Sequence, residues 1–204
     1  DNTNAYWNWW TGGTGTDFVL RWNRYRVPRH YKEYAAFYVA HEILGHMAQL
    51  TFLRRRIDNG ALPRCLGLFL IHDPGIIQAE GLAQTLWRHL ADEIYHTPFT
   101  NALAELEYLE DMAKHNAFLM LDDGRPVEDA VNLRAYYSGF DDKHAELDNM
   151  SEGFAHPVTR CYEIVYAPAR FMFRRITDHA GPEERNRFLK NMLTGWYIPD
   201  RIAQ

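Results

Sequence analysis

The stretch from Tyr31 to Arg56 constrains the fold most, because it follows Pro28 and carries apolar side chains at helical spacing over its whole length. These side chains are Tyr34, Phe37, Tyr38, Ile43, Met47, Leu50 and Leu53. The pattern ends just before Asn59-Gly60, a pair that is typical of turns. We therefore expect one long helix here, called the motif helix, with the rest of the chain packed around it.

Proline and glycine mark the ends of several further helices. Pro74-Gly75 begins a helix that runs to about Tyr95, before Thr97-Pro98. The same signals predict helices over residues 99–121, 126–137, 157–179 and 182–193, the last ending before Gly195. Residues 1–16 are typical of turns, and Phe18–Trp22 is predicted to be a short strand. The expected class is mainly α, as a single domain over 1–204 with an irregular or strand lead-in over 1–28.

Composition excludes several classes of protein. The chain has 204 residues, of which 47% are hydrophobic, so it can bury a core without disulfides. Its 22 basic and 27 acidic residues give a net charge of -5 without a basic run, which argues against a nucleic-acid partner. Since no apolar run approaches about 18 residues, we expect a soluble protein without a membrane span. A cytoplasmic location is favoured, with the compartment left open, and Cys65 and Cys161 are predicted to be buried free thiols.

The densest chemistry lies at His41-Glu42-Ile43-Leu44-Gly45-His46, in the middle of the motif helix. With Glu80 on the next predicted helix, His41 and His46 supply two imidazoles and one carboxylate. Such a set leaves a coordination position open for water, as catalytic zinc requires. Glu42 would then take the proton of that water as general base. We expect one Zn²⁺ per chain, although iron, manganese or cobalt would also suit these ligands.

The spacing of the two histidines departs from the HExxH pattern of zinc proteases, because His41 and His46 are five residues apart. At about 100° per residue, a step of four leaves two side chains about 40° apart, and a step of five leaves them about 140° apart. A regular helix would not bring the two rings together. We therefore predict a π-bulge or a broken turn at Leu44-Gly45. For an isolated HExxxH string, the alternative is that His41 and Glu42 are ordinary polar residues on a helix face.

The segment from His41 to Gln49 resembles the HE...PGHHLQ segment of a bacterial family of uncharacterised metallopeptidase-like proteins related to the Taq-type carboxypeptidases. Glu80-Gly81-Leu82-Ala83 is similar to the EGWA segment of that family, which supplies the third ligand. Weaker similarities follow in order at 121–130, at Tyr166 with Arg170, and from Phe188 to Pro199. The HExxxH spacing also resembles the tubulin-type tyrosine carboxypeptidases. The resemblance implies a gluzincin-like helical lobe and a carboxypeptidase-like peptidase.

This sequence departs from the family pattern in two ways. Leu44 stands where the family has proline, and the step between the histidines is shorter. Members of the family are also much longer, with an N-terminal helical lobe that forms the other wall of the cleft. The resemblance therefore implies the catalytic half only. A second lobe or a partner chain would complete the cleft around a peptide, or an open cleft would take a small-molecule substrate.

Two further residues receive roles from the resemblance. Tyr166 is the candidate donor to the oxyanion of a tetrahedral intermediate, with a core tyrosine beside Tyr162 as the alternative. Arg170, one turn further along the helix, is the candidate for binding a substrate carboxylate. The alternative for Arg170 is an ion pair with a structural carboxylate.

Three other functions remain open from the sequence. A metalloenzyme on the same scaffold would act on a small amide, an ester or a natural-product intermediate. A di-iron bundle would need two ExxH pairs and two further glutamates, and only Glu93 to His96 has that spacing. A binding module without catalysis would have no reason to keep His41, Glu42, His46 and Glu80 together.

Overall fold

The computed structural model describes residues 9–14, 17–22, 32–68, 73–90, 96–138, 151, 153 and 155–202. Helices dominate these residues, and two strands form a small sheet, so the expected mainly α class is confirmed. No helix in this described part of the chain is long and apolar enough to span a membrane. Cys65 and Cys161 are free, but both are exposed, so the prediction that they are buried is wrong.

The motif helix consists of three consecutive segments. An α-helix, α1 (Lys32–Val39), leads into a π-helix, η1 (Ala40–Met47), and a second α-helix, α2 (Ala48–Asp58), completes it. Gly60 follows with a φ of 71°, the left-handed conformation that favours glycine after a helix. The predicted bulge at Leu44-Gly45 is confirmed, and the π-helical stretch extends over residues on both sides of it.

The helices predicted over 99–121, 126–137 and 182–193 are confirmed to within one residue at each end, as α4 (Pro98–Asp122), α5 (Val127–Ser138) and α9 (Pro182–Thr194). The helix predicted to run to about Tyr95 is shorter, because α3 (Ile76–Leu86) tightens into η3 (Trp87–His89) and Leu90 is extended. Residues 157–179 form α7 (Pro157–Glu163) and α8 (Tyr166–His179), and two short helices that were not predicted are η2 (Arg64–Gly67) and α10 (Pro199–Ile202). The Thr97 side chain accepts the N–H of Thr100 and caps α4. The single helix predicted over 157–179 is wrong in one respect, because α7 and α8 are separated at Ile164-Val165.

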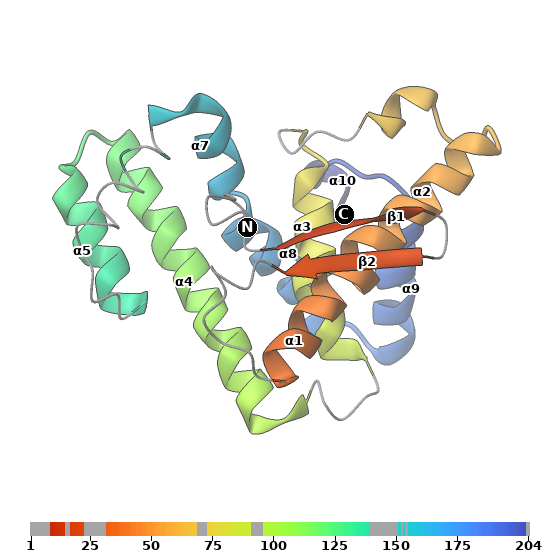
Figure 1. The fold of residues 1–204 in the computed structure, drawn as a ribbon, viewed down its shortest axis with the longest axis horizontal. Coiled ribbons are helices and arrows are strands. Elements are labelled where there is room, and N and C mark those ends of the chain that lie inside the picture. Colours follow the sequence, from red (N-terminus) through yellow and green to blue (C-terminus); the bar gives the residue numbers. More distant parts are fainter. Residues whose placement is uncertain are drawn as a thin grey trace.

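A β-hairpin precedes the helices. Strand β1 (Trp9–Thr14) pairs antiparallel with β2 (Asp17–Trp22), in a register that places Trp9 opposite Trp22 and Thr14 opposite Asp17. The strand predicted over Phe18–Trp22 is confirmed, whereas the turns predicted over residues 1–16 are wrong for β1. The hairpin lies against η1, as Figure 1 shows.

Helix α3 is the central element of the fold. It packs against η1 on one side and against α8 on the other, and every residue from Gln78 to Thr85 is buried. Two glycines permit these close approaches: a Cβ on Gly45 would lie 2.7 Å from the Cα of Ala83, and a Cβ on Gly81 would lie 2.2 Å from the Phe173 ring. In Figure 1, α4 and α5 lie to one side of this group of helices.

Buried glutamines tie the end of α9 to the central helices. Gln78 donates to the carbonyl oxygens of Met192 and Gly195, and its own oxygen accepts the N–H of Tyr197. Gln49 donates to the same Met192 carbonyl from α2. Buried polar groups without partners would destabilise the fold, so these bonds fix how α9 packs.

We expect Gly45→Ala to lower the free energy of unfolding by about 1–3 kcal/mol, because the new methyl group would overlap the backbone of Ala83 and force η1 away from α3. Thermal or urea unfolding measures the effect. Gly67→Ala is the matched control, since its nearest atom, Cδ1 of Ile57, would lie at an ordinary 3.8 Å. Equal stability of the two variants would show that η1 and α3 do not need this close contact.

Candidate metal centre

The π-helix brings the two histidines of the motif onto one face. Because a π-helix is bonded from i to i+5, residues five apart lie one above the other on successive turns. The Nε2 atoms of His41 and His46 are 3.2 Å apart, and their rings meet edge to face. Glu80 enters from α3, with Oε2 at 3.7 Å from Nε2 of His41 and Oε1 at 3.7 Å from Nε2 of His46. Three predicted ligands from two helices therefore converge.

These separations suit a tetrahedral metal. Ligand atoms bound at about 2.0–2.1 Å occupy corners of a tetrahedron whose edges are about 3.4 Å long. The 3.2 Å between the two Nε2 atoms and the 3.7 Å from each of them to one oxygen of Glu80 are close to such edges. The two 3.7 Å separations end on different oxygens, so the carboxylate would have to turn for one oxygen to complete the set. Two imidazoles and one carboxylate are also the donor set found in catalytic zinc sites. The residues present therefore fit a zinc ion with little rearrangement.

The Glu80 carboxylate supports the same interpretation. Glu80 is 2% exposed, and its Oε2 is buried with no hydrogen-bond partner among the described residues. An unpaired carboxylate oxygen in the interior is costly unless a cation satisfies it. A bound cation would satisfy this oxygen.

Glu42 lies beside the ligands, on the same helix. Its Oε1 is 3.8 Å from Nε2 of His41, and its side chain is 12% exposed against 3% for Glu80. Single atoms of His41, Glu42 and His46 lie within 4.8 Å of one another, so Glu42 is also close enough to be a ligand. The group of single ligand atoms that lie within this distance contains Glu42 and not Glu80, whereas the Glu80 oxygen is the more buried and lacks a partner among the described residues. With Glu80 as the ligand, Glu42 has the position of a base next to the metal.

The three ligands share a set of coupled charges. Burial, assisted by the charge of His46, lowers the pKa of His41 to about 3. Burial alone would also lower the pKa of His46, but attraction to Glu80 and Glu42 outweighs it and raises that pKa. In Glu80 the effect of burial is likewise outweighed, by His46 and His41, and the pKa is lowered. Of the two histidines, His46 is therefore the one whose protonated form the site favours.

The structure places Tyr166 one step away from the ligands. Its hydroxyl donates to the hydroxyl of Tyr162, and Tyr162 donates to Oε1 of Glu80 at 3.3 Å. Burial raises the pKa of both tyrosines, so both hydroxyls keep their protons. The sequence named Tyr166 and offered Tyr162 only as a core neighbour. The hydroxyl that contacts a ligand belongs to Tyr162, and only the helical spacing of the two tyrosines pointed to it.

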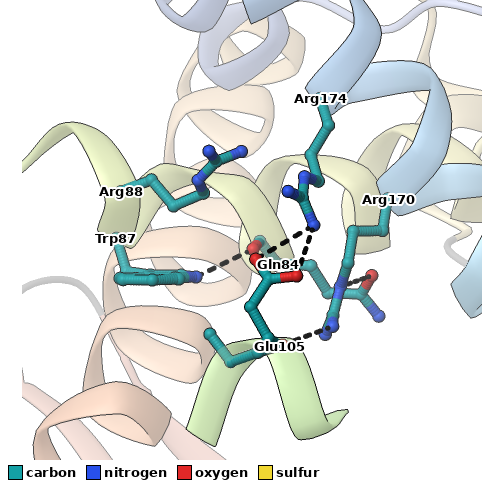
Figure 2. Close-up of a pocket in the computed structure, with 7 residues that line it drawn as sticks. Gln84, Trp87, Arg88, Glu105, Arg170 and Arg174 are labelled. Atoms are coloured by element: carbon teal, nitrogen blue, oxygen red, sulfur yellow. Dashed lines mark hydrogen bonds and ion pairs between the residues drawn. The ribbon is translucent and has the colours of Figure 1, made fainter. Parts of the chain in front are cut away.

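Arg170 forms an ion pair with a carboxylate of the protein, which is the alternative to binding a substrate carboxylate. It is 5% exposed and lies 3.3 Å from Asp111 on α4. Its Nε donates to Gln84 and its Nη1 to the carbonyl of Ala104. Figure 2 shows Arg170 directed at Gln84, while its neighbour Arg174 reaches Glu105. These partners occupy the guanidinium, which is where a substrate carboxylate would have to bind.

A second group of acids, partly buried, lies near His41. Tyr38, whose ring is 6.3 Å from that of His41, donates to Oε1 of Glu107 at 2.7 Å. Burial raises the pKa of Glu107 to about 7, against the effect of this hydrogen bond, and Asp111 adds to the rise. Burial also raises the pKa of Asp111 despite its arginine partner. Nothing in the sequence pattern distinguished Glu107 from the other acids of α4.

The di-iron alternative finds little support among the described residues. His96 contacts the carbonyl of Leu90 through Nε2, and Glu93 and Glu152 lie outside the described part of the chain.

Comparison with known proteins gives no match. No family model matches the chain, and neither a curated protein nor a solved structure shows significant similarity to it. The resemblance to the metallopeptidase-like family stays an expectation based on the motifs.

We expect Glu107→Gln to make stability less dependent on pH. The folded-state pKa of Glu107 is raised from 4.5 to about 7, so its contribution to stability is complete below pH 4.5 and is lost as the pH rises through 7. Relative to the parent chain, the variant should gain up to about 1.4 kcal/mol per pH unit across this window. Urea unfolding from pH 5 to 8 with a chelator present measures the gain.

Glu105→Gln is the control for this measurement, because it removes a carboxylate of the same helix whose side chain is 59% exposed. A constant difference between Glu107→Gln and the parent chain at all pH values would contradict the assignment.

Proposed function

We propose that this chain is a zinc-dependent hydrolase in which His41, His46 and Glu80 hold the metal and Glu42 is the general base. The observation that carries the proposal is the convergence of two Nε2 atoms and an unpartnered buried carboxylate oxygen at separations close to those of a tetrahedral site. A second carboxylate next to these ligands supplies the base. An ordinary polar helix face would not collect these groups in the interior.

Zinc, when bound, supplies the acidification of a water molecule and the polarisation of a substrate carbonyl. Glu42 accepts the proton of that water and can pass it to the leaving group, since its carboxylate lies beside the ligands and is partly open to solvent. The lowered pKa values of His41 and Glu80 favour the forms that bind a metal, and His46 would have to be neutral to bind.

The reaction that we propose is hydrolysis of an amide or ester bond, with peptides as the first substrate class because of the motif resemblance. Arg170 is held by Asp111 and Gln84, so the proposal does not assign it to a terminal carboxylate. This arrangement favours the alternative of a small amide or ester over a strict carboxypeptidase. Internally quenched peptides, peptides with free C-termini and aryl esters distinguish these possibilities.

We expect the purified chain to contain about one zinc ion and His46→Ala to lose it, because two ligands cannot hold the ion as three do. Plasma mass spectrometry of the two proteins measures the content. His179→Ala, which removes an exposed histidine, should keep the metal. Two iron ions per chain would favour the di-iron alternative, and a metal-free chain after addition of zinc would overturn the proposal.

We expect Glu42→Gln to reduce kcat/KM by about 10²–10⁴-fold on any substrate found, because the amide cannot accept the proton of the water. Its zinc content should remain that of the parent chain, since Glu80 is the carboxylate ligand. Glu183→Gln, on the exposed start of α9, should leave the rate unchanged. Loss of zinc in Glu42→Gln would instead identify Glu42 as a ligand.

A further inference from the structure

The two oxygens of the Glu80 carboxylate have different surroundings. Oε1 accepts a hydrogen bond from Tyr162 at 3.3 Å and lies 3.7 Å from His46. Oε2 is buried, has no hydrogen-bond partner among the described residues, and lies 3.7 Å from His41. The hydrogen bond from Tyr162 therefore distinguishes the two oxygens of this carboxylate.

The bond to Oε1 belongs to a chain of three groups. Tyr166 donates to the oxygen of Tyr162, and Tyr162 donates to Glu80. Because a phenol has one proton, the hydrogen bond that Tyr162 receives from Tyr166 leaves its own proton for the carboxylate. The donor direction of both hydrogen bonds is therefore set at Tyr166, which is the first residue of α8.

The helices hold these hydrogen-bonded tyrosines in place. Tyr162 lies near the end of α7, and the break at Ile164-Val165 separates it from α8. The two rings still meet edge to face at 5.2 Å, and the N–H of Val165 bonds to the Tyr162 carbonyl. Tyr162 also packs with the buried cluster of Ile76, Ala79, Val165 and Ala169, which joins α3 to α8. The phenol is thus fixed against the same helix that carries Glu80.

We propose that Tyr162 is a positioning residue of the metal centre, which holds Oε1 of Glu80 so that the unpartnered Oε2 is presented to the metal, and that Tyr166 orients Tyr162. The inference rests on the proposed function, because it assigns a role toward the metal that His41, His46 and Glu80 would bind. Hydrogen bonds to ligating side chains fix their orientation and commonly change metal affinity by about 10–100-fold when they are lost. Tyr166 is two hydrogen bonds away from the carboxylate that would bind the metal.

The test compares Tyr162→Phe and Tyr166→Phe with Tyr197→Phe. This control removes the hydroxyl of a partly buried tyrosine that takes no part in the hydrogen bonds from Tyr166 to Glu80. Zinc affinity is measured by competition with a chromogenic chelator, and the coordination geometry by the visible spectrum of the Co²⁺-loaded protein. Circular dichroism and thermal unfolding check that each variant folds. Neither metal measurement requires a substrate.

We expect Tyr162→Phe to lose about 10–100-fold in zinc affinity and to change the cobalt spectrum. Tyr166→Phe should lose less and show a smaller change of the same kind, and Tyr197→Phe should match the parent chain. Should Tyr162→Phe fail to fold, the Tyr166→Phe spectrum decides. That variant retains the Tyr162 hydroxyl and removes only the hydroxyl that orients it. Parent-like affinity and spectrum in the Tyr162→Phe and Tyr166→Phe variants that fold would overturn this inference alone, whereas a parent chain that binds neither metal would overturn the proposed function with it.

Discussion

The contact between η1 and α3 at Gly45 and Ala83 is the constraint on which the site depends. The π-helix aligns His41 with His46, but only a close approach of α3 brings Glu80 within 3.7 Å of both. Glycine permits this approach, because any side chain at position 45 would overlap the backbone of Ala83. Gly81 then lets α8 pack just as closely on the far side. Backbone conformation and helix packing thus act together at a single turn.

Charge explains why a divalent cation suits this interior. Glu42, Glu80, Glu107 and Asp111 bring four carboxyl groups into or beside the core, where Arg170 is the guanidinium that pairs with one of them. Burial raises the pKa of Glu107 and of Asp111, which makes their charged forms less favourable. The charge of Glu80 in turn raises the pKa of His46. A metal ion at the histidines would offset the same negative charge.

Most of the helices could be predicted, because proline and glycine mark their ends and the apolar spacing marks their faces. The π-helix could be predicted as well, since a step of five between His41 and His46 is incompatible with convergence on an α-helix. Strand β1 could not, because its Gly-rich sequence becomes a strand only through pairing with β2. The partners of Arg170 and the bond from Tyr162 to Glu80 join residues far apart in the sequence, so helical spacing could not reveal them.

The fold itself brings the candidate ligands together, so a metal would meet groups that are already close to their places. The 3.2 Å between the two Nε2 atoms suits a shared hydrogen, and it is also close to the edge of a zinc tetrahedron. Because the pKa of His41 and that of Glu80 are both lowered, the forms of these groups that bind a metal are favoured, whereas the raised pKa of His46 opposes binding. The hydrogen bond from Tyr162 occupies one oxygen of Glu80 and leaves the other for a cation. The proposed metal site would therefore need little rearrangement of its side chains.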